Sequence, residues 1–307
     1  MRLGVLDVGS NTVHLLVVDA HRGAHPWPTH SEKAVLRLAD QLGPGGSISP
    51  ASAGALVEAV GEARRSAERL AVDDFLAFAT SAVRDAANGP AVLRQIRDAT
   101  GVDLQVLPGE DEARTTFLAV RRWFGWSAGH LLVVDIGGGS LELASGLDEE
   151  PELALSLPLG AGRLTRDHLA GADPPSAEAV AELAGYVDSV LDPVVEKLAG
   201  ARWDRAVATS KTLRSLARLA GAAPSGAGHW TPRQLTATGL HQVLGFIRHI
   251  PARALAGMDG VSASRAHQLL AGAVVTAAIL RRLKIDVLHQ CPWALREGVI
   301  LRRLDLT

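Results

Sequence analysis

Cysteine is nearly absent from this chain, since Cys291 is the only one among 307 residues. A single cysteine excludes an intramolecular disulfide framework and also the zinc sites that are built on Cys-x-x-Cys pairs. The histidines do not replace them, because spacings such as His241 to His249 do not match the i, i+4 pair of a helical metal site. We therefore expect neither a disulfide-stabilised secreted protein nor a zinc enzyme.

An excess of charge of one sign is also missing. Lys and Arg number 31 and Asp and Glu number 33, so the formal net charge is −2. Binding of nucleic acid requires a broad basic field, and the 6 tryptophans are scattered rather than arranged as platforms for stacked bases. We expect no nucleic-acid partner, and any anionic ligand must be held locally.

Long uninterrupted hydrophobic runs are lacking as well. Asp7 interrupts the apolar N-terminal run before the core of a secretory signal could form. The most apolar later stretch, residues 269–280, is shorter than the roughly 20 residues that cross a bilayer, so we predict a buried helix there. These features favour a cytoplasmic protein with no membrane partner.

What the chain does contain is ample apolar material and an internal repeat. Hydrophobic residues make up 47% of the sequence, and 307 residues favour two domains or one domain of duplicated halves. The segments LGVLDVGSNTVHLLVVD at 3–19 and LLVVDIGGGSLELAS at 131–145 each predict two strands around a tight polar turn, with Asp7 and Asp135 in matching positions. AFATSAVRDA at 77–86 and AVATSKTLRS at 206–215 repeat at nearly the same separation, which indicates two lobes of common design.

Helical periodicity lies between these landmarks. The predicted helices cover residues 52–70, 90–100, 111–123, 176–198, 212–219, 231–250 and 264–283. Strands and helices are interspersed, so the fold class is α/β with mixed sheets. The glycine-containing segment 124–130 is the best crossing between lobes, which places them at residues 1–125 and 126–307. The alternative that we keep open is a last helix that packs back on the first lobe.

The two predicted turns have the composition of anion-binding loops. Ser10, Asn11 and Thr12 can present backbone amides and hydroxyls to an anion, although an ordinary hairpin turn is an equal alternative. The run Gly137, Gly138, Gly139 favours the anion, because three glycines weaken a strand unless the backbone must closely approach a ligand. Phosphate is the natural candidate.

Three acids lie beside these turns. Asp7 precedes the first turn, and Asp135 and Glu142 flank the second, where a shared Mg²⁺ could bridge phosphate oxygens. The alternative for Glu142 is a solvent-facing strand residue between Leu141 and Leu143, as simple alternation would predict.

Six ordered motifs carry a family resemblance. They are DVGSNT at 7–12, ATSAVRDAAN at 79–88, PGEDEAR at 108–114, DIGGGSLEL at 135–143, SLPLGAGRLT at 156–165 and CPWALREGVI at 291–300. In order and spacing, and over nearly the whole chain, they resemble the exopolyphosphatase and guanosine pentaphosphate phosphatase family. The resemblance implies the fold of actin, sugar kinases and heat-shock chaperones, in which two ribonuclease-H-like lobes enclose a cleft.

The resemblance also implies roles for residues. The two loops would grip phosphates from opposite lobes; their phosphate-binding residues are Ser10, Asn11, Thr12, Gly137, Gly138, Gly139 and Ser140. Arg84 would contact the phosphate chain, although a surface arginine paired with a nearby acid is the alternative. Glu112 would be the general base, while Glu110 and Asp111 serve the dipole of a helix N-terminus.

One stretch departs from the family pattern. Many relatives have a glycine-rich loop where this chain has Ala208 to Thr212, and Lys211 replaces that glycine-rich character. Lys211 would either contact distal phosphates or lie on a solvated helix start. Arg296 and Glu297 fit the terminal motif, and we interpret their role as structural, an ion pair that holds the last helix against a lobe.

The resemblance implies a Mg²⁺-dependent exopolyphosphatase, with Mn²⁺ as a substitute, that prefers short polyphosphates. Hydrolysis of guanosine pentaphosphate is the first alternative, and a non-catalytic sensor of nucleotide or polyphosphate is an alternative of another class. A homodimer is expected because relatives commonly dimerise, and the alanine-rich helix at 266–280 could pack against a partner.

Overall fold

The computed structural model describes residues 1–21, 23 and 25–306, and these divide into two compact units. The first unit comprises Met1–Ala119 and Leu295–Thr307, and the second comprises Val120–Ala294. The boundary expected after residue 125 is therefore corrected to Ala119. It falls inside a helix that continues to Phe124, so the glycines of the crossing segment do not mark it. The last helix belongs to the first unit, which is the alternative that the sequence left open.

A five-stranded sheet forms the centre of the first unit, in the order β3-β2-β1-β4-β5. Its strands are β1 (Arg2–Val8), β2 (Thr12–Asp19), β3 (Pro28–Val35), β4 (Asp74–Ala79) and β5 (Gln105–Val106). β1 and β2 form the predicted hairpin, and they place Asp7 directly opposite His14. β4 and β5 extend the sheet in parallel.

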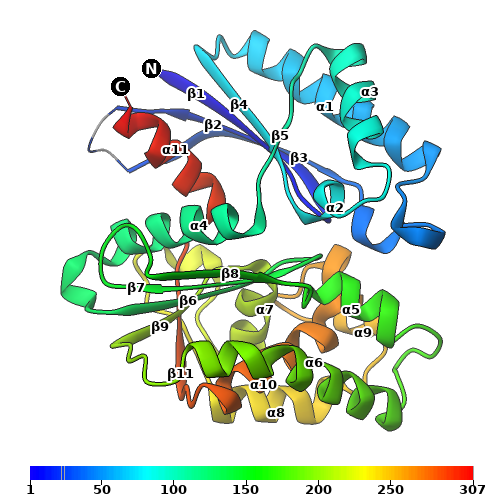
Figure 1. Ribbon diagram of the computed structural model, residues 1–307, viewed down its shortest axis with the longest axis vertical. Coiled ribbons are helices and arrows are strands. Elements are labelled where there is room, and N and C mark those ends of the chain that lie inside the picture. The colour runs from blue at the N-terminus through cyan, green and yellow to red at the C-terminus, as the bar shows by residue number, and fades with distance from the viewer. Residues whose placement is uncertain (22, 24, 307) are drawn as a thin grey trace. The chain divides into compact units, whose positions relative to one another are not determined.

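Helices cover both faces of this sheet (Figure 1). Leu6 and Val8 of β1 pack with α1 (Pro50–Arg69) and α3 (Gly89–Thr100), whereas Leu3 and Val5 pack with α11 (Leu295–Asp305). This split follows from the alternation of side chains along a strand. The other helical segments are α2 (Ser81–Arg84), α4 (Gly109–Phe124), η1 (Leu38–Asp40) and η2 (Pro44–Gly46).

The second unit has a six-stranded sheet in the order β10-β11-β9-β6-β7-β8. Its strands are β6 (Leu131–Ile136), β7 (Leu141–Gly146), β8 (Leu153–Leu157), β9 (Arg205–Ala208), β10 (Gln234–Thr236) and β11 (Val287–Gln290). β6 and β7 form the second predicted hairpin. In reverse, β8-β7-β6-β9-β11 repeats the order of the first sheet with two antiparallel pairs followed by two parallel ones, which confirms the common design.

The helices of the second unit gather around α10 (Leu269–Arg282), which is buried along most of its length. The others are α5 (Ala161–His168), α6 (Ala177–Lys197), α7 (Lys211–Leu219), α8 (Ala237–Ile247) and α9 (Ala252–Leu255), with η3 (Trp126–Ala128), η4 (Ser225–Ala227) and η5 (Ala263–Gln268). By length and composition the described stretch Ala263–Arg282 could cross a membrane, but 72% of its apolar window is buried in the protein. The buried helix predicted at 269–280 is confirmed.

Two predicted helices begin too early in the sequence. The helix expected at 231–250 starts at Ala237, because the preceding residues pair as β10 with β11 and Thr236 caps the helix by accepting a hydrogen bond from the Gly239 amide at 3.0 Å. The helix expected at 264–283 starts as the 3-10 segment η5 and becomes α-helical at Leu269. In both cases the apolar spacing continues smoothly across the change in backbone conformation.

Candidate phosphate-binding site

The first loop, between β1 and β2, is held in place by hydrogen bonds from the segment that follows β3 to the loop carbonyls. The Asn11 carbonyl accepts hydrogen bonds from the amides of Leu36 and Arg37, both at 3.0 Å, and the Ser10 carbonyl accepts one from Ala39 at 3.0 Å. Ser10 Oγ lies 2.9 Å from Ser81 Oγ, which links the loop to the start of α2. Ser10 and Asn11 are buried and Thr12 is partly exposed, so the buried pair shapes the loop as well as lining it.

Arg84 and Glu112 meet in the first unit, as their predicted roles require. Arg84 ends α2 and Glu112 lies in the first turn of α4, and Nη1 of Arg84 donates to Oε2 of Glu112 at 3.0 Å. Arg84 also donates to Asp85 Oδ1 at 3.0 Å and to the Leu107 carbonyl at 3.3 Å. The side chains of Arg84 and Glu112 are only 19% and 12% exposed, so Arg84 is not a surface residue, but it is paired with nearby acids as the alternative expected, and its contact with phosphate stays a prediction.

Electrostatics reinforce this pair. Burial by itself lowers the pKa of Arg84, but the neighbouring carboxylates of Glu112 and Asp85 outweigh it, so the pKa of Arg84 is raised. The guanidinium is thus fully charged beside the acid. Of the three acids at the start of α4, Glu110 and Asp111 are exposed and only Glu112 turns inward. Exposed acids at a helix N-terminus are stabilised by the backbone dipole, so Glu110 and Asp111 need no other role, while the role of Glu112 as a base stays a prediction.

Asp7 lies two residues before the first loop, on β1. It is opposite His14, whose Nε2 is 2.8 Å from Ser31 Oγ. Oδ2 of Asp7 is also 3.4 Å from Nη1 of Arg296, on α11. The ion pair expected for Arg296 is therefore present, but its partner is a predicted site residue rather than an acid of remote structural role.

The second loop, between β6 and β7, is held by the start of α5. This segment belongs to the SLPLGAGRLT motif, for which the sequence analysis gave no role. The carbonyls of Gly137 and Gly138 accept hydrogen bonds from the amides of Ala161 and Arg163 at 2.9 Å, and the Gly139 carbonyl accepts one from Arg163 Nε at 2.8 Å. All three carbonyls therefore face α5. Because C=O and N–H point in opposite directions in a trans peptide, the following amides, up to that of Ser140, point away from α5. Successive amides aimed one way form an anion-binding concavity.

Gly160 permits this close approach. A Cβ on Gly160 would lie 2.2 Å from the carbonyl carbon of Gly139 and 2.3 Å from the amide nitrogen of Ser140. No side chain fits there, so the glycine allows α5 to touch the back of the loop. Gly160 and Arg163 are thus site-supporting residues that we missed, and their signal was membership of the SLPLGAGRLT motif.

Asp135 and Glu142 are direct cross-strand partners on β6 and β7. Glu142 is 5% exposed and its Oε1 accepts a hydrogen bond from Ser156 Oγ at 2.9 Å, so the alternative of a solvent-facing strand residue is wrong. Like charges directly opposite each other destabilise a sheet, and carboxylate oxygens are the ligands that Mg²⁺ prefers. No group of three His, Cys, Asp or Glu gathers anywhere in the described residues, so a cation at this pair stays a prediction.

The sequence as a whole matches one family along most of its length. Residues 17–307 match the profile of the Ppx/GppA phosphatase family. The chain belongs to this family. It is 58% identical to exopolyphosphatase 1 of Mycobacterium tuberculosis over 306 residues, which cover 99% of the chain and 89% of that protein.

Other members of the Ppx/GppA family are more distant. The chain is 26% identical to the guanosine-5'-triphosphate,3'-diphosphate pyrophosphatase of Aeromonas salmonicida, over 96% of the chain and 58% of that protein. The crystal structure of an exopolyphosphatase from Cytophaga hutchinsonii superposes with a TM-score of 0.88 over 100% of the chain and 99% of that protein, at 24% identity. The actin-like, two-lobed fold implied by the resemblance is therefore confirmed.

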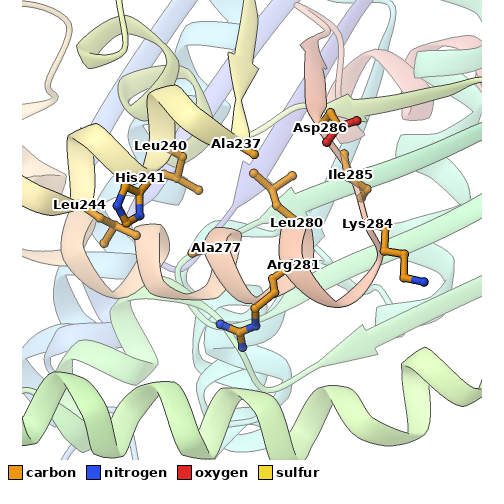
Figure 2. Close-up of a pocket in the computed structure, with 10 residues that line it drawn as sticks. All are labelled: Ala237, Leu240, His241, Leu244, Ala277, Leu280, Arg281, Lys284, Ile285 and Asp286. Atoms are coloured by element: carbon orange, nitrogen blue, oxygen red, sulfur yellow. The ribbon is translucent and has the colours of Figure 1, made fainter.

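Two further features of the second unit of this Ppx/GppA phosphatase concern the predicted site. Lys211 is exposed at the first residue of α7, whose cap is Ser210, so a phosphate contact for Lys211 stays a prediction. A cavity of about 530 Å³ is lined by residues of α8 and α10, including Leu240, His241 and Arg281 (Figure 2). None of the predicted site residues lines it, and its wall is mainly apolar.

Proposed function

We propose that the chain is an exopolyphosphatase, which hydrolyses the terminal phosphoanhydride bond of inorganic polyphosphate and releases orthophosphate. The observation that carries the proposal is the 58% identity, over 99% of the chain, to a protein named exopolyphosphatase 1. The contact between Arg84 and Glu112 and the two braced loops support it, because they supply a base, a phosphate-binding cation and oriented amides.

Glu112 acts as the general base in this proposal. Its carboxylate is mostly buried and contacts Arg84, and it would take a proton from a water that attacks the terminal phosphorus in line. Arg84 would hold the phosphate whose position brings that water next to Glu112. General base catalysis by a positioned side chain contributes about 10²- to 10⁴-fold to a rate, so Glu112 would account for a large share of turnover.

The loops would stabilise the charge that the reaction redistributes. The amides after Gly137 and Gly138 point away from α5, and hydrogen-bond donors fixed in this way stabilise the equatorial oxygens of a transferring phosphoryl group. Their orientation is set before substrate binds, since Arg163 and Ala161 hold the carbonyls. Preorganised donors of this kind need no rearrangement during the reaction.

Asp135 and Glu142 would hold a Mg²⁺, with Asp7 of β1 as a further ligand and Mn²⁺ as a substitute. Few protein ligands are needed, because Mg²⁺ usually keeps several waters and binds phosphate oxygens of the substrate. When bound, the cation would offset negative charge on the bridging and terminal oxygens.

Hydrolysis of guanosine pentaphosphate is the second candidate. The family includes proteins named for that nucleotide substrate, but the one compared above is only 26% identical to the chain and the chain spans 58% of its length. Polyphosphate is therefore the better-supported substrate, and a homodimer in the cytoplasm with a preference for short chains completes the proposal.

The test is phosphate release by the wild-type protein from short polyphosphate, long polyphosphate and guanosine pentaphosphate in parallel, with Mg²⁺ or with EDTA. We expect Mg²⁺-dependent release from polyphosphate, fastest with short chains. Release from the nucleotide alone would promote the second candidate. Binding of all three without release would instead indicate a sensor.

A further inference from the structure

A second cavity of the second unit lies at the carboxyl end of β11. Its volume is about 390 Å³, and it is lined mainly by α7, by the segment that follows α7 and by the residues from Gln290 to Pro292. Gln290 is paired with Ala208 of β9, and Ala208 is paired with Val134 of β6, in a parallel arrangement. The three strands therefore end at one edge of the sheet, and β6 and β11 are two strand spacings apart, or about 10 Å. Because β6 leads into the second loop, the cavity lies on the edge of the sheet that carries this loop.

Positive charge prevails in this cavity, although the chain as a whole has a formal net charge of −2. The arginines and acids that line it are Arg214, Arg218, Arg233 and Asp259. Arg218 donates a hydrogen bond to Asp259, so this carboxylate already has a cationic partner. Arg233 donates to backbone carbonyls between residues 223 and 231, which fix the guanidinium without neutralising its charge. An excess of guanidinium groups favours an anionic ligand, and phosphate is an anion whose oxygens they match.

Two side chains that line the cavity have buried polar atoms without a hydrogen-bond partner among the described residues. These atoms are Oε1 and Nε2 of Gln290 and Nε of Arg218. A donor that is shielded from water and unpaired destabilises a protein, so such atoms usually mark a ligand or an ordered water. The cavity is within the range of roughly 300–1,000 Å³ that small-molecule sites occupy, and its apolar lining consists of small side chains such as those of Ala217, Ala222 and Ala223. The cavity thus favours a group rich in oxygen over a hydrocarbon group.

We propose that this cavity is a second phosphate-binding site, which holds distal phosphates of a polyphosphate whose terminal phosphate lies at the second loop. The proposal rests on the proposed function for its substrate, but binding of the polymer can be measured without turnover. Two binding positions on one sheet edge act like two linked sites, so a chain that spans both binds more tightly than a chain that reaches only the loop. The separation of the two positions therefore sets the shortest chain that the protein binds well.

The test compares R214Q with R253Q. Arg214 lies on α7 and lines the cavity, whereas Arg253 is an exposed arginine of α9 in the same unit that does not line it. KM is measured from phosphate release with tripolyphosphate, which is too short to reach from the loop to the cavity, and with a long polyphosphate. We expect R214Q to raise KM for the long polymer about tenfold, because a charge-assisted contact to phosphate is lost. KM for tripolyphosphate should stay within about twofold of the wild type, since a charge about 10 Å away is largely screened. R253Q should match the wild type with both substrates.

The dependence on chain length separates this site from general damage to the protein. If R214Q raises KM equally for both substrates, or for neither, the proposal is overturned. Q290L is a second variant for the same question. Leucine removes an amide that has no partner, so thermal stability should not fall, while KM for the long polymer should rise about threefold and KM for tripolyphosphate should not. A stable Q290L with the wild-type KM for both substrates would contradict the proposal.

Calorimetry in EDTA distinguishes distal phosphates of the substrate from a separate ligand. The proposal predicts that long polyphosphate binds R214Q about tenfold more weakly than it binds the wild type. If R214Q instead loses the binding of one tripolyphosphate molecule while both KM values stay, the cavity binds a separate oligophosphate and the proposal is overturned. A wild type that releases no phosphate would refute the proposed function, and the calorimetric comparison would still test the cavity.

Discussion

The two phosphate loops come from one duplicated design but are built in different ways. The first loop is joined to its surroundings by side chains as well as backbone, and Ser10 contacts Ser81 at the start of the short helix that ends in Arg84. The second loop is three bare glycines whose carbonyls are held by α5. In the proposed function this difference becomes a division of labour, in which the first unit would supply Arg84 and Glu112 as side chains and the second would supply oriented backbone amides.

The helices that follow β4 and β9 show the same divergence. Both begin with Ala-Thr-Ser, but where the first unit has Arg84 beside Glu112, the matching position in the second unit is Leu213, which is fully buried in the core. The first copy of the motif thus carries a charged side chain where the second carries an apolar one. The second copy forms the amphipathic helix α7, capped by Ser210.

Among the substitutions that perturb the two loops, the largest expected effect comes from crowding the back of the second loop. In G160A the new methyl group would overlap the backbone of Gly139 and Ser140, so the loop must move. Because misplacement by about 1 Å can cost ~100-fold in rate, we expect kcat/KM for polyphosphate to fall about 100-fold. The control is G185A on α6, where nothing lies within 4 Å of the added carbon and helix propensity favours alanine.

Thermal unfolding of both variants would show whether G160A is unfolded or only has a displaced loop. If G160A is as active as the wild type, the contact between α5 and the second loop does not support activity.

The second prediction concerns Arg84, at the end of helix α2 in the first unit. R84Q removes the cation from Glu112 and Asp85, and we expect kcat/KM to fall about 30-fold, within the range of charge-assisted contacts to phosphate. R84K should recover only part of this, since an ammonium cannot reproduce the planar fork that reaches several partners. R97Q, a substitution of an exposed arginine on α3, is the control. If R84Q kept full activity, the ion pairs of Arg84 would have only a structural role.

How far the sequence predicts these regions depends on whether the deciding contact is local. The two hairpins, with Asp7 and Asp135 in matching positions, follow from apolar runs around turn residues, and they were predicted correctly. The burial of Glu142 was not predicted, because alternation treats β7 as half exposed, whereas β8 lies beside it and Ser156 reaches its carboxylate. Local pattern cannot reveal a neighbour that the chain brings back later.

The same limit explains the braces of the site. Gly160 and Arg163 act on a loop that precedes them by a whole strand pair, and Arg296 reaches Asp7 from the opposite end of the chain. Their residue types carry no local signal of these contacts. The strand β10 shows the same limit in secondary structure. Its three residues were predicted to be helical, but they pair with β11, which lies about 50 residues later in the chain.

A smaller effect should follow from loosening the second loop without crowding it. R163L removes the hydrogen bond to the Gly139 carbonyl but leaves the backbone bond from residue 163 to Gly138. We expect KM to rise about tenfold, roughly the free energy of one hydrogen bond from a charged donor. An activity loss as large as that of G160A would mean that the side chain of Arg163, rather than backbone packing, holds the loop.

The smallest effect is predicted for Lys211, which is exposed at the start of α7. K211A should raise KM only about threefold, and the difference from wild type should disappear at high salt, because exposed charges are screened over about 10 Å at 0.1 M ionic strength. The comparison of KM at low and high salt checks this. A large, salt-independent loss would show that Lys211 makes a buried phosphate contact.

The central claim of the proposed function is that Glu112, in the first unit, is the general base. The direct measurement compares E112Q with the wild type in two experiments, the rate of phosphate release from short polyphosphate and the binding of the same polymer by calorimetry. The account predicts that release falls at least about 100-fold while binding stays within a few-fold, since glutamine keeps the shape of the side chain and loses the ability to accept a proton. Release near the wild-type rate would contradict it and would place the base elsewhere.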